Sequence, residues 1–270
     1  MSVSVIIPSL GGNLCRTLDS LNSGSVLPDE IIICLPNKTH KIDNASDYKN
    51  LTIVYADRYG QVYQRAVGFK QAKGDKVLQL DDDILLDEFC LERLISTLDK
   101  LPEHSAMSPC LFNSDNTPLY QTRKNGVLSL YYFLINGRKG YQPGRVTRAG
   151  TNFGVNPNEV TGDQVEIEWQ PGGCVLHRKE NLILEDYYPQ QGKAYCEDLM
   201  HSFLLRKKGV HLFVNTKAKC ATPLNPKLFL SKEIAPDFKA RLFFVRMANL
   251  SVTRMLLHYM VYIVRSFGSK

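Results

Sequence analysis

Residues 76–89 read KVLQLDDDILLDEF, and the fold assignment starts from this stretch. Its first part, residues 76–80, follows the turn Gly74-Asp75 and predicts a short buried strand. Three carboxylates, Asp81, Asp82 and Asp83, come directly after it. Because like charges repel, such a run needs a partner. We therefore expect it either to cap the helix that follows or to bind a cation.

The flanking sequence alternates short β-branched runs with helical patterns. Strands are expected at residues 4–8, 31–34, 51–55 and 76–80, and helices at residues 13–21, 61–72 and 89–98. This order on short connections predicts an α/β fold, a Rossmann-like, mixed and mostly parallel sheet flanked by helices. Its ligands should gather at the carboxyl ends of the strands. Residues 111–168 are rich in Gly, Asn, Pro and Tyr and predict a loop-dominated insertion.

Composition places the chain among globular proteins. Of its 270 residues 44% are hydrophobic and 22% charged, which is enough to build a large core. The longest apolar runs fall short of the roughly 20 residues of a membrane-spanning helix, and MSVSVIIPSL lacks the features of a signal peptide. The seven cysteines form no Cys-x-x-Cys pair, so we expect reduced core residues in a cytoplasmic protein.

Charge is distributed unevenly along the chain. Residues 206–270 hold 13 Lys and Arg against two acidic residues, a net +11, so the preceding residues carry −5 of the overall +6. We expect a main domain at residues 1–225 and a basic, amphipathic, helical C-terminal extension at residues 226–270. In residues 238–267 the apolar Leu242, Val245, Val252, Leu256 and Ile263 share one helical face. That face either packs on the core or rests on an anionic membrane surface.

The aspartate run has two interpretations. Capping of the next helix suits Asp87 and Glu88, which are nearer to it, better than the three earlier acids. A divalent cation site fits the run itself, because Mg²⁺ and Mn²⁺ prefer carboxylate oxygens and often bridge them to substrate phosphates. Alternation along the chain points Asp81 and Asp83 to the same side, so we expect both to face one ion or one ligand.

Several motifs occur in a fixed order along the chain. They are SVSVIIPS at residues 2–9, PDEIIIC at 28–34, YQRAVG at 63–68, AKGDKVLQLDDDI at 72–84, EWQPGGC at 168–174 and YCED at 195–198. In order and spacing this set resembles the nucleotide-sugar half of family 2 glycosyltransferases, over about residues 2–220. The resemblance implies a GT-A fold and a nucleotide-sugar donor, most simply a UDP-sugar.

The resemblance also implies roles for particular residues. Asp83 would be the principal ligand of Mn²⁺ or Mg²⁺ with Asp81, while Asp81 and Asp82 would contact the ribose or the waters of the metal. The other residues expected at the donor are Pro8, Ser9, Leu10, Asp57, Arg65, Trp169 and Gly173. For Arg65, the alternative is a surface arginine on an amphipathic helix. A metal at this position would stabilise the negative charge that builds on the leaving diphosphate.

Transfer also needs a base for the acceptor hydroxyl. Glu197-Asp198 resembles the Glu-Asp motif of the family, in which the aspartate is the usual base, although acidic residues there also suit a helix N-terminus. A carboxylate opposite the leaving group implies inversion at the anomeric carbon. The Gln-x-x-Arg-Trp signature of processive synthases is absent, so one sugar per encounter is expected.

The chain departs from the family pattern at three points. Relatives usually have Asp-Asp-Gly-Ser after the second strand, where this chain has Cys34-Leu35-Pro36-Asn37. The arginine expected seven residues after Glu197 is Leu204, and no histidine follows the last strand at residues 215–220. The base of the nucleotide and the third metal ligand are therefore left open.

The sequence thus predicts a metal-dependent, inverting hexosyltransferase. Its acceptor would be a glycan or a lipid-linked oligosaccharide of surface polysaccharide synthesis, with no nucleic acid involved. Attachment would be peripheral, at the inner face of the cell membrane through the C-terminal helix. Two alternatives stay open, a sugar nucleotidyltransferase and an inactive glycan-binding or scaffold module of the same fold.

Overall fold

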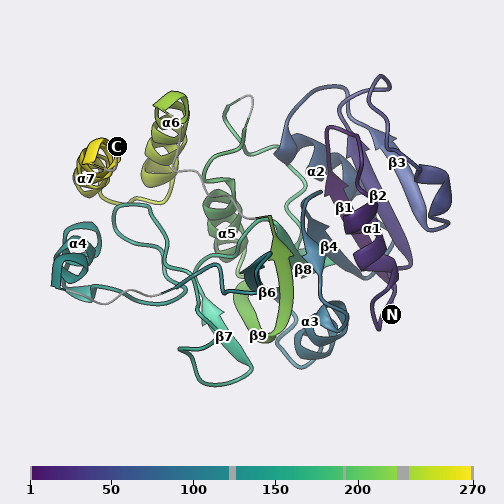
Figure 1. Ribbon diagram of the computed structural model, residues 1–270, viewed down its shortest axis with the longest axis horizontal. Helices are drawn as coiled ribbons and strands as arrows, with labels where there is room; N and C mark the ends of the chain where they lie inside the picture. The colour runs from purple at the N-terminus through teal and green to yellow at the C-terminus, as the bar shows by residue number, and fades with distance from the viewer. Residues whose placement is uncertain (1, 122–125, 191–192, 224–230, 269–270) are drawn as a thin grey trace.

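The computed structural model of the chain describes residues 2–121, 126–190, 193–223 and 231–268 (Figure 1). The N-terminal half alternates strands and helices as the sequence predicts. Its elements are β1 (Val3–Pro8), α1 (Cys15–Asn22), β2 (Glu30–Leu35), η1 (Ala45–Asp47), β3 (Leu51–Tyr55), α2 (Gln61–Gln71), β4 (Lys76–Leu80), β5 (Leu85–Leu86) and α3 (Cys90–Leu98). The expected strands and helices of this half lie within about two residues of the observed ones, because their apolar residues recur with clear periods.

The second half is less regular. Its elements are β6 (Ser105–Asn113), α4 (Gly126–Asn136), η2 (Gly137–Lys139), β7 (Gln164–Ile167), β8 (Cys174–Arg178), η3 (Lys179–Asn181), α5 (Glu197–Lys207), β9 (His211–Thr222), α6 (Ser231–Met247) and α7 (Val252–Gly268). The insertion at residues 111–168 consists mainly of loops, as expected. It also contains α4, which the sequence analysis does not predict.

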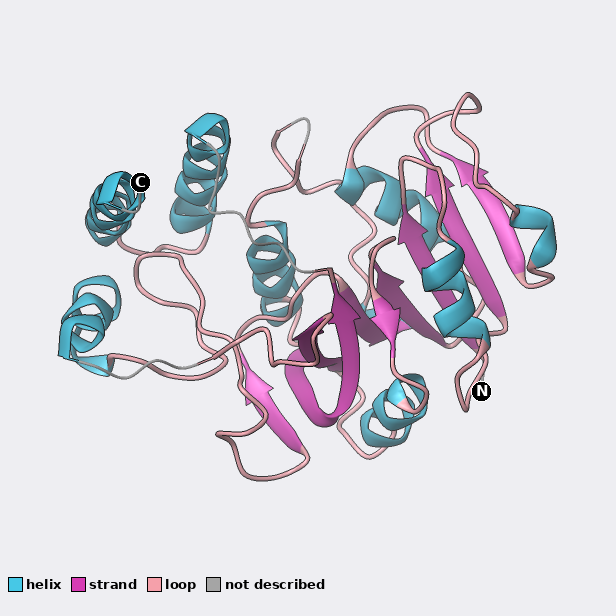
Figure 2. Cartoon of the chain, viewed as in Figure 1, coloured by secondary structure: helices cyan, strands magenta, loops and turns pink. Residues whose placement is uncertain are grey.

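One mixed sheet joins the two halves (Figure 2). Its order is β3-β2-β1-β4-β8-β6-β9-β5, with β7 paired to β9. The β3-β2-β1-β4 part is parallel throughout, and β8 runs antiparallel to both β4 and β6. The parallel part therefore brings the carboxyl ends of β1, β2, β3 and β4 to one edge, and this edge is where an α/β fold binds ligands.

Helices cover both faces of the sheet. Helices α1 and α3 pack on one face, where Leu18 and Leu94 join the core with Val5 and Ile7. Helix α2 packs on the other face, where Phe69 meets Ile6 and Ile32. Because helices cover both faces, every residue of β1 and β4 is buried.

A glycine sets the position of α2. A Cβ atom on Gly68 would lie 2.7 Å from Cys34 Sγ and would also overlap Ile6. Only glycine lets the helix approach β1 and β2 this closely. The approach fixes the polar residues Gln61, Gln64 and Arg65 of α2 against the sheet edge.

The C-terminal extension differs from the expected single amphipathic face. It forms two helices, α6 and α7, with a break near Asn249, which adopts a left-handed backbone with φ of 52°. Val245 is fully buried while Leu256 is 46% exposed, so residues expected on one face lie in different surroundings. The break changes the register between the two helices and explains this difference. The expected boundary at residues 225/226 lies outside the described residues.

No helix in the described part of the chain combines the length and the apolar character that crossing a membrane requires. The helices α4, α6 and α7 lie together at the end of the molecule opposite β3 (Figure 1).

Candidate active site

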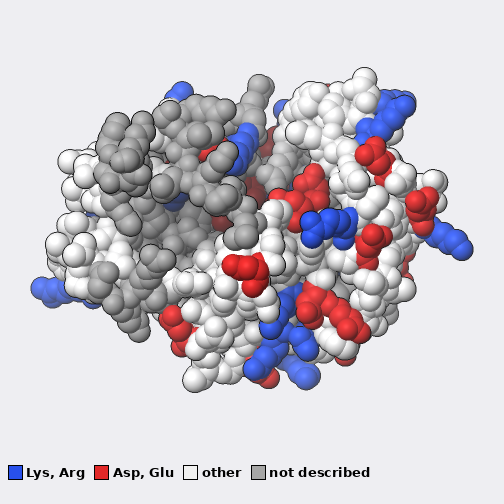
Figure 3. All heavy atoms as spheres, viewed as in Figure 1, with Lys and Arg blue, Asp and Glu red and all other residues white. Residues whose placement is uncertain are grey.

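The three aspartates leave the sheet at the end of β4. The strand ends at Leu80, and residues 81–83 turn, with the Ile84 amide 3.4 Å from the Asp81 carbonyl. Side-chain alternation therefore stops before Asp81, and the expectation that Asp81 and Asp83 share one side is not met. Asp82 and Asp83 instead line one hollow of about 400 Å³ together with Arg16. Figure 3 shows acidic and basic side chains mingled over this part of the surface.

Asp81 faces inward to α2 and α5. Its Oδ1 accepts hydrogen bonds from Gln61 Nε2 at 3.0 Å and Arg65 Nη2 at 3.3 Å. Burial raises the pKa of Asp81 to about 6, and the negative charges of Glu197 and Asp83 add to the rise while Arg65 opposes it. Asp81 is thus held by side chains of α2, although it lies near the edge of the sheet.

Arg65 joins the elements of the site. It is only 2% exposed, and its Nη1 donates to Glu197 Oε1, which also accepts the Tyr187 hydroxyl at 2.6 Å. Burial lowers the pKa of Arg65, but the adjacent carboxylates of Glu197 and Asp81 outweigh it and raise the pKa above its ordinary value. The expected direct contact with a nucleotide does not fit this position, because the guanidinium is enclosed by its own ion pairs. The surface-arginine alternative does not fit either.

A cavity of about 470 Å³ opens at the ends of β1 and α2. Pro8, Ser9, Leu10 and Asp82 line it, so the structure brings together four of the residues expected at the donor. The Ser9 hydroxyl donates to Asp82 Oδ2 at 2.6 Å. Asp82 also borders the hollow that contains Asp83, and therefore connects the cavity with the exposed end of the aspartate run.

The sequence analysis misses several residues of this cavity. Tyr59, Gln61, Gln64 and Lys193 also line it. Gln64 is held in place because its amide donates to the Ser9 and Cys34 carbonyls at 2.8 and 2.6 Å. The sequence feature that could have indicated these residues is the pair Gln61 and Gln64, which lie one helical turn apart at the start of α2.

Two further expected residues lie outside this cavity. Asp57 is exposed after β3 and does not line it. Trp169 is 2% exposed, and its Nε1 donates to the Phe153 carbonyl at 2.9 Å. Its ring packs with Met200 and Phe244 in the core beneath α5 and α6, so the structure does not bring the indole to a donor.

Gly172 and Gly173 allow the site to close. The Asp81 amide donates to the Gly173 carbonyl at 2.9 Å, and a Cβ atom on Gly172 would lie 2.8 Å from Glu197 Oε2. A side chain at this position would displace the Glu197 carboxylate, which is paired with Arg65. Gly173 is therefore a backbone neighbour of Asp81.

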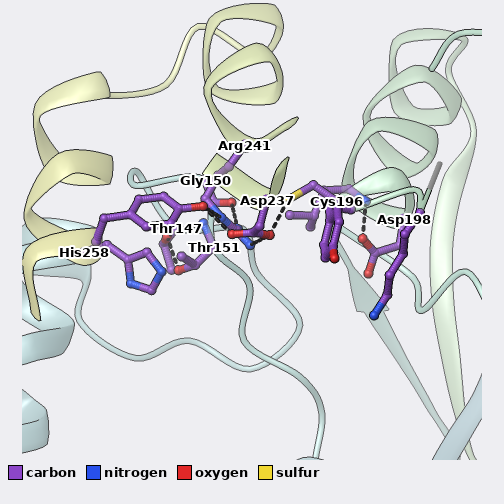
Figure 4. Close-up of polar contacts among 12 residues, drawn as sticks. Thr147, Gly150, Thr151, Cys196, Asp198, Asp237, Arg241 and His258 are labelled. Atoms are coloured by element: carbon purple, nitrogen blue, oxygen red, sulfur yellow. Dashed lines mark hydrogen bonds and ion pairs between the residues drawn. The ribbon is translucent and has the colours of Figure 1, made fainter. Parts of the chain in front are cut away.

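Asp198 lies at the start of α5, where its Oδ1 accepts the Leu199 amide at 2.9 Å (Figure 4). Its side chain is partly exposed. Burial, followed by the charge of Glu197, raises the pKa of Asp198 to about 7. A carboxylate with this pKa can accept a proton near neutral pH. The two acids of the motif thus differ, because Glu197 pairs with Arg65 while Asp198 is available.

Two buried histidines lie behind the Arg65 pair. His201 stacks on Tyr187 with ring centroids 5.9 Å apart, and His177 lies 5.4 Å from His201. Burial, with the charge of Arg65, lowers the pKa of His201 to about 3, so the ring is neutral. Both histidines are therefore packed core residues.

The acidic side chains at the end of β4 would offer a metal ion only oxygen ligands. Among the described residues no three His, Cys, Asp or Glu side chains are grouped to hold an ion. Asp82 and Asp83 supply carboxylates on one hollow, and this donor set fits Mg²⁺ or Mn²⁺, which bind through one or two carboxylates and substrate phosphates.

Residues 4–156, more than half of the chain, match the model of the family described as glycosyl transferase family 2. The chain belongs to this family. The match confirms the resemblance found from the motifs, and it ends before the EWQPGGC and YCED segments.

Solved structures with a similar fold confirm the predicted GT-A architecture. The crystal structure of GalNAc-T7 with UDP, GalNAc and Mn²⁺ has a TM-score of 0.62 at 18% identity, covering 91% of this chain and 48% of that one. The S. aureus TarS 1-349 complex with UDP has a TM-score of 0.53 at 15% identity, covering 94% of this chain and 68% of that one. The TarS 1-349 complex with UDP-GlcNAc has a TM-score of 0.51 at 14% identity, covering 94% of this chain and 69% of that one. The family 2 chain thus spans about half the length of GalNAc-T7. A search of curated proteins found no match.

Replacing Arg65 with Met in this family 2 protein should lower the free energy of unfolding by roughly 3–5 kcal/mol, because Glu197 would stay buried without its cation. Urea unfolding measures the change. The matched control is Arg58→Met, which removes the 2.8 Å pair of Arg58, 60% exposed, with Asp186 and should cost less than about 1 kcal/mol. Equal stability of the two variants would show that the Arg65 pairs do not hold the site together.

Proposed function

We propose that the chain transfers one sugar from a nucleoside diphosphate sugar to a glycan or lipid-linked oligosaccharide in surface polysaccharide synthesis. The observation that carries the proposal is the pair of Arg65 ion pairs that links the start of α5 to the aspartate run. Glu197, the residue before Asp198, shares Arg65 with Asp81, so the proposed base and the proposed donor-binding acids are coupled through one side chain.

The donor is proposed to be a UDP-sugar in the 470 Å³ cavity. Asp82 offers a carboxylate to a ribose or a base, and Lys193 offers a cation to a phosphate. The Ser9 and Gln64 side chains, which already bond to Asp82 and to the backbone, shape the wall beside them. Support also comes from the solved neighbours, which were crystallised with UDP or UDP-GlcNAc. The pair Cys34-Leu35 ends β2 without the usual acids, so we make no assignment of the base-reading group.

Asp83 and Asp82 would hold Mn²⁺ or Mg²⁺ together with the diphosphate of the donor, and we assign Asp81 a supporting position through Arg65. When bound, the cation would neutralise charge on the leaving diphosphate. GalNAc-T7 was crystallised with Mn²⁺, which supports a divalent ion.

Asp198 is proposed as the general base. The Leu199 amide holds its Oδ1, so Oδ2 can receive the proton of the acceptor hydroxyl. As that proton leaves, the acceptor oxygen bonds to the anomeric carbon, and the bond from this carbon to the diphosphate oxygen breaks. Attack opposite the leaving group inverts the anomeric configuration, and UDP departs with the bonding electrons.

Exposed apolar side chains support a membrane-borne acceptor. Met260 and Val264 on α7 are 63% and 71% exposed, and Val127, Leu130 and Phe133 on α4 are also exposed. Arg254 joins the two helices by donating to the Phe133 carbonyl at 3.0 Å. Exposed Arg138, Lys139 and Arg148 lie near this surface, as an anionic bilayer would require. We propose peripheral attachment to the inner face of the cell membrane through α4 and α7.

Asp83→Ala should reduce both sugar transfer and donor hydrolysis by roughly 10²–10³-fold or more, because a preorganised charge at the diphosphate would be lost. Released nucleoside diphosphate is measured across UDP-, GDP- and dTDP-sugars with Mn²⁺. Glu88→Ala, an exposed acid in the same connection, is the control and should keep its rate. Near-normal turnover of Asp83→Ala would refute the metal assignment. Failure of the unaltered protein to turn over any donor would favour the inactive-module alternative.

The dependence of kcat/KM on pH should show the protonation of Asp198. Because its pKa is raised to about 7 and the base must be unprotonated, kcat/KM should rise with pH up to about 7 and then level off. Asp198→Asn should remove this inflection and lower the rate by about 10²–10⁴-fold, while donor binding is kept. A profile that stays flat from pH 5 to 9 in the unaltered protein would exclude Asp198 as the base.

Membrane attachment is tested by sedimentation with phosphatidylglycerol vesicles. Met260→Glu combined with Val264→Glu should weaken partitioning by more than about tenfold, because both apolar contacts are lost. Leu27→Glu changes an equally exposed apolar residue, at 56%, outside this surface and should have no effect. Absence of sedimentation of the unaltered protein, or equal sedimentation of all variants, would rule out this attachment.

A further inference from the structure

A second pocket lies between α4 and the C-terminal helices. It has a volume of about 380 Å³, and its walls come from the insertion, α6 and α7. It shares no lining residue with the 470 Å³ donor cavity. We propose that this pocket binds a neutral pyranose ring of the acceptor glycan, an inference that rests on the proposed transferase function and specifies its substrate class.

Aromatic side chains form the walls. The pocket is lined by Tyr131, Tyr132, Phe153, Tyr259 and Tyr262. Tyr132 meets Phe153 edge-on, with ring centroids 5.3 Å apart, so these rings are fixed by one another. Rigid aromatic faces suit the apolar C–H faces of a sugar ring. The volume lies in the lower range of small-molecule sites, consistent with one or two sugar units.

The base of the pocket is polar but internally neutralised. Arg241 donates to Asp237 at 3.2 Å, to the Gly150 carbonyl at 2.7 Å and to Tyr259 at 3.3 Å. A guanidinium has five N–H groups, so three hydrogen bonds leave donors for a ligand hydroxyl. Because Asp237 already balances the charge, the site offers no net attraction to a phosphate or carboxylate.

His258 keeps the same wall uncharged. Its Nδ1 lies 2.7 Å from the Tyr131 hydroxyl. Burial, together with the charge of Arg241, lowers the pKa of His258 to about 4, so the ring is neutral at physiological pH. Thr151 and Asn152 add a hydroxyl and an amide to the lining. Aromatic faces combined with neutral hydrogen-bonding groups match a polyol ring better than an anion or a peptide.

The pocket adjoins the segment that carries the proposed base. Cys196 Sγ lies 3.8 Å from Asp237 Oδ1, and Cys196 directly precedes Glu197-Asp198. Figure 4 shows this contact as a dashed line. Cys196 takes a left-handed backbone with φ of 56° at the N-terminus of α5. A sugar held over Asp237 would therefore belong to a glycan whose next unit can reach Asp198. The pocket would position the acceptor, and Asp198 would receive its proton.

Binding is tested directly by saturation-transfer-difference NMR on the full chain. The probes are the methyl glycosides of glucose, galactose, mannose and N-acetylglucosamine, with sodium phosphate as the anionic competitor. At least one glycoside should bind, and phosphate should not displace it. Tyr132→Ala and, independently, Tyr262→Ala on a different helix should weaken binding by about tenfold, the loss expected for an aromatic contact. Phe89→Ala changes an exposed aromatic residue that directly precedes α3; it is the matched control and should bind as the unaltered protein does.

Donor hydrolysis in the same variants separates this inference from the proposed function. If both hold, the tyrosine variants hydrolyse a UDP-sugar normally, but their KM for the acceptor rises by about tenfold. If no glycoside binds, or if the tyrosine variants bind as tightly as Phe89→Ala, the pocket inference is wrong even when donor turnover persists. If glycosides bind as predicted but no donor is turned over, the proposed transferase function fails and the pocket remains a glycan site.

Discussion

The assembly of the site depends on one buried cation. Arg65 pairs with Glu197 and Asp81, which come from α5 and from the end of β4, and the guanidinium is only 2% exposed. Without Arg65 the two carboxylates would face each other in a region of low dielectric, at a cost of several kcal/mol. The pairing also fixes the start of α5, and therefore the position of Asp198. Gly172 and Gly68 permit the close approaches that bring these elements to Arg65.

The two halves of the molecule have different proposed roles, one in binding the donor and the other in binding the acceptor. The parallel β3-β2-β1-β4 half presents its carboxyl ends, with Ser9 and Asp82, to the proposed nucleotide sugar. The insertion and the two C-terminal helices supply the proposed acceptor pocket and the exposed apolar face. Charge is also uneven along the chain, with −5 before residue 206 and +11 from residue 206 onward. Asp198 follows Cys196, the residue whose Sγ lies 3.8 Å from Asp237 Oδ1 in the C-terminal part.

The sequence was informative where burial imposes a period. The strand at Lys76–Leu80 was predicted to the residue because it is buried on both faces, and the family motifs identified the fold. The directions of Asp81 and Asp83 could not be predicted, because alternation holds only within a strand and this one ends at Leu80. The burial of Arg65 could not be predicted from the sequence either, because its partner Glu197 is 132 residues away along the chain. Helix α4 has apolar residues around its circumference and gives no clear amphipathic pattern.

The central claim is that an Arg65-centred framework holds the donor acids and the base in one site. A crystal structure of the protein soaked with Mn²⁺ and UDP tests it most directly. The account predicts Mn²⁺ on Asp83 next to the diphosphate, the nucleoside in the cavity lined by Ser9 and Gln64, and Arg65 still paired with Glu197 and Asp81. Nucleotide bound elsewhere, or Arg65 released from Glu197 and turned to the diphosphate, would contradict it.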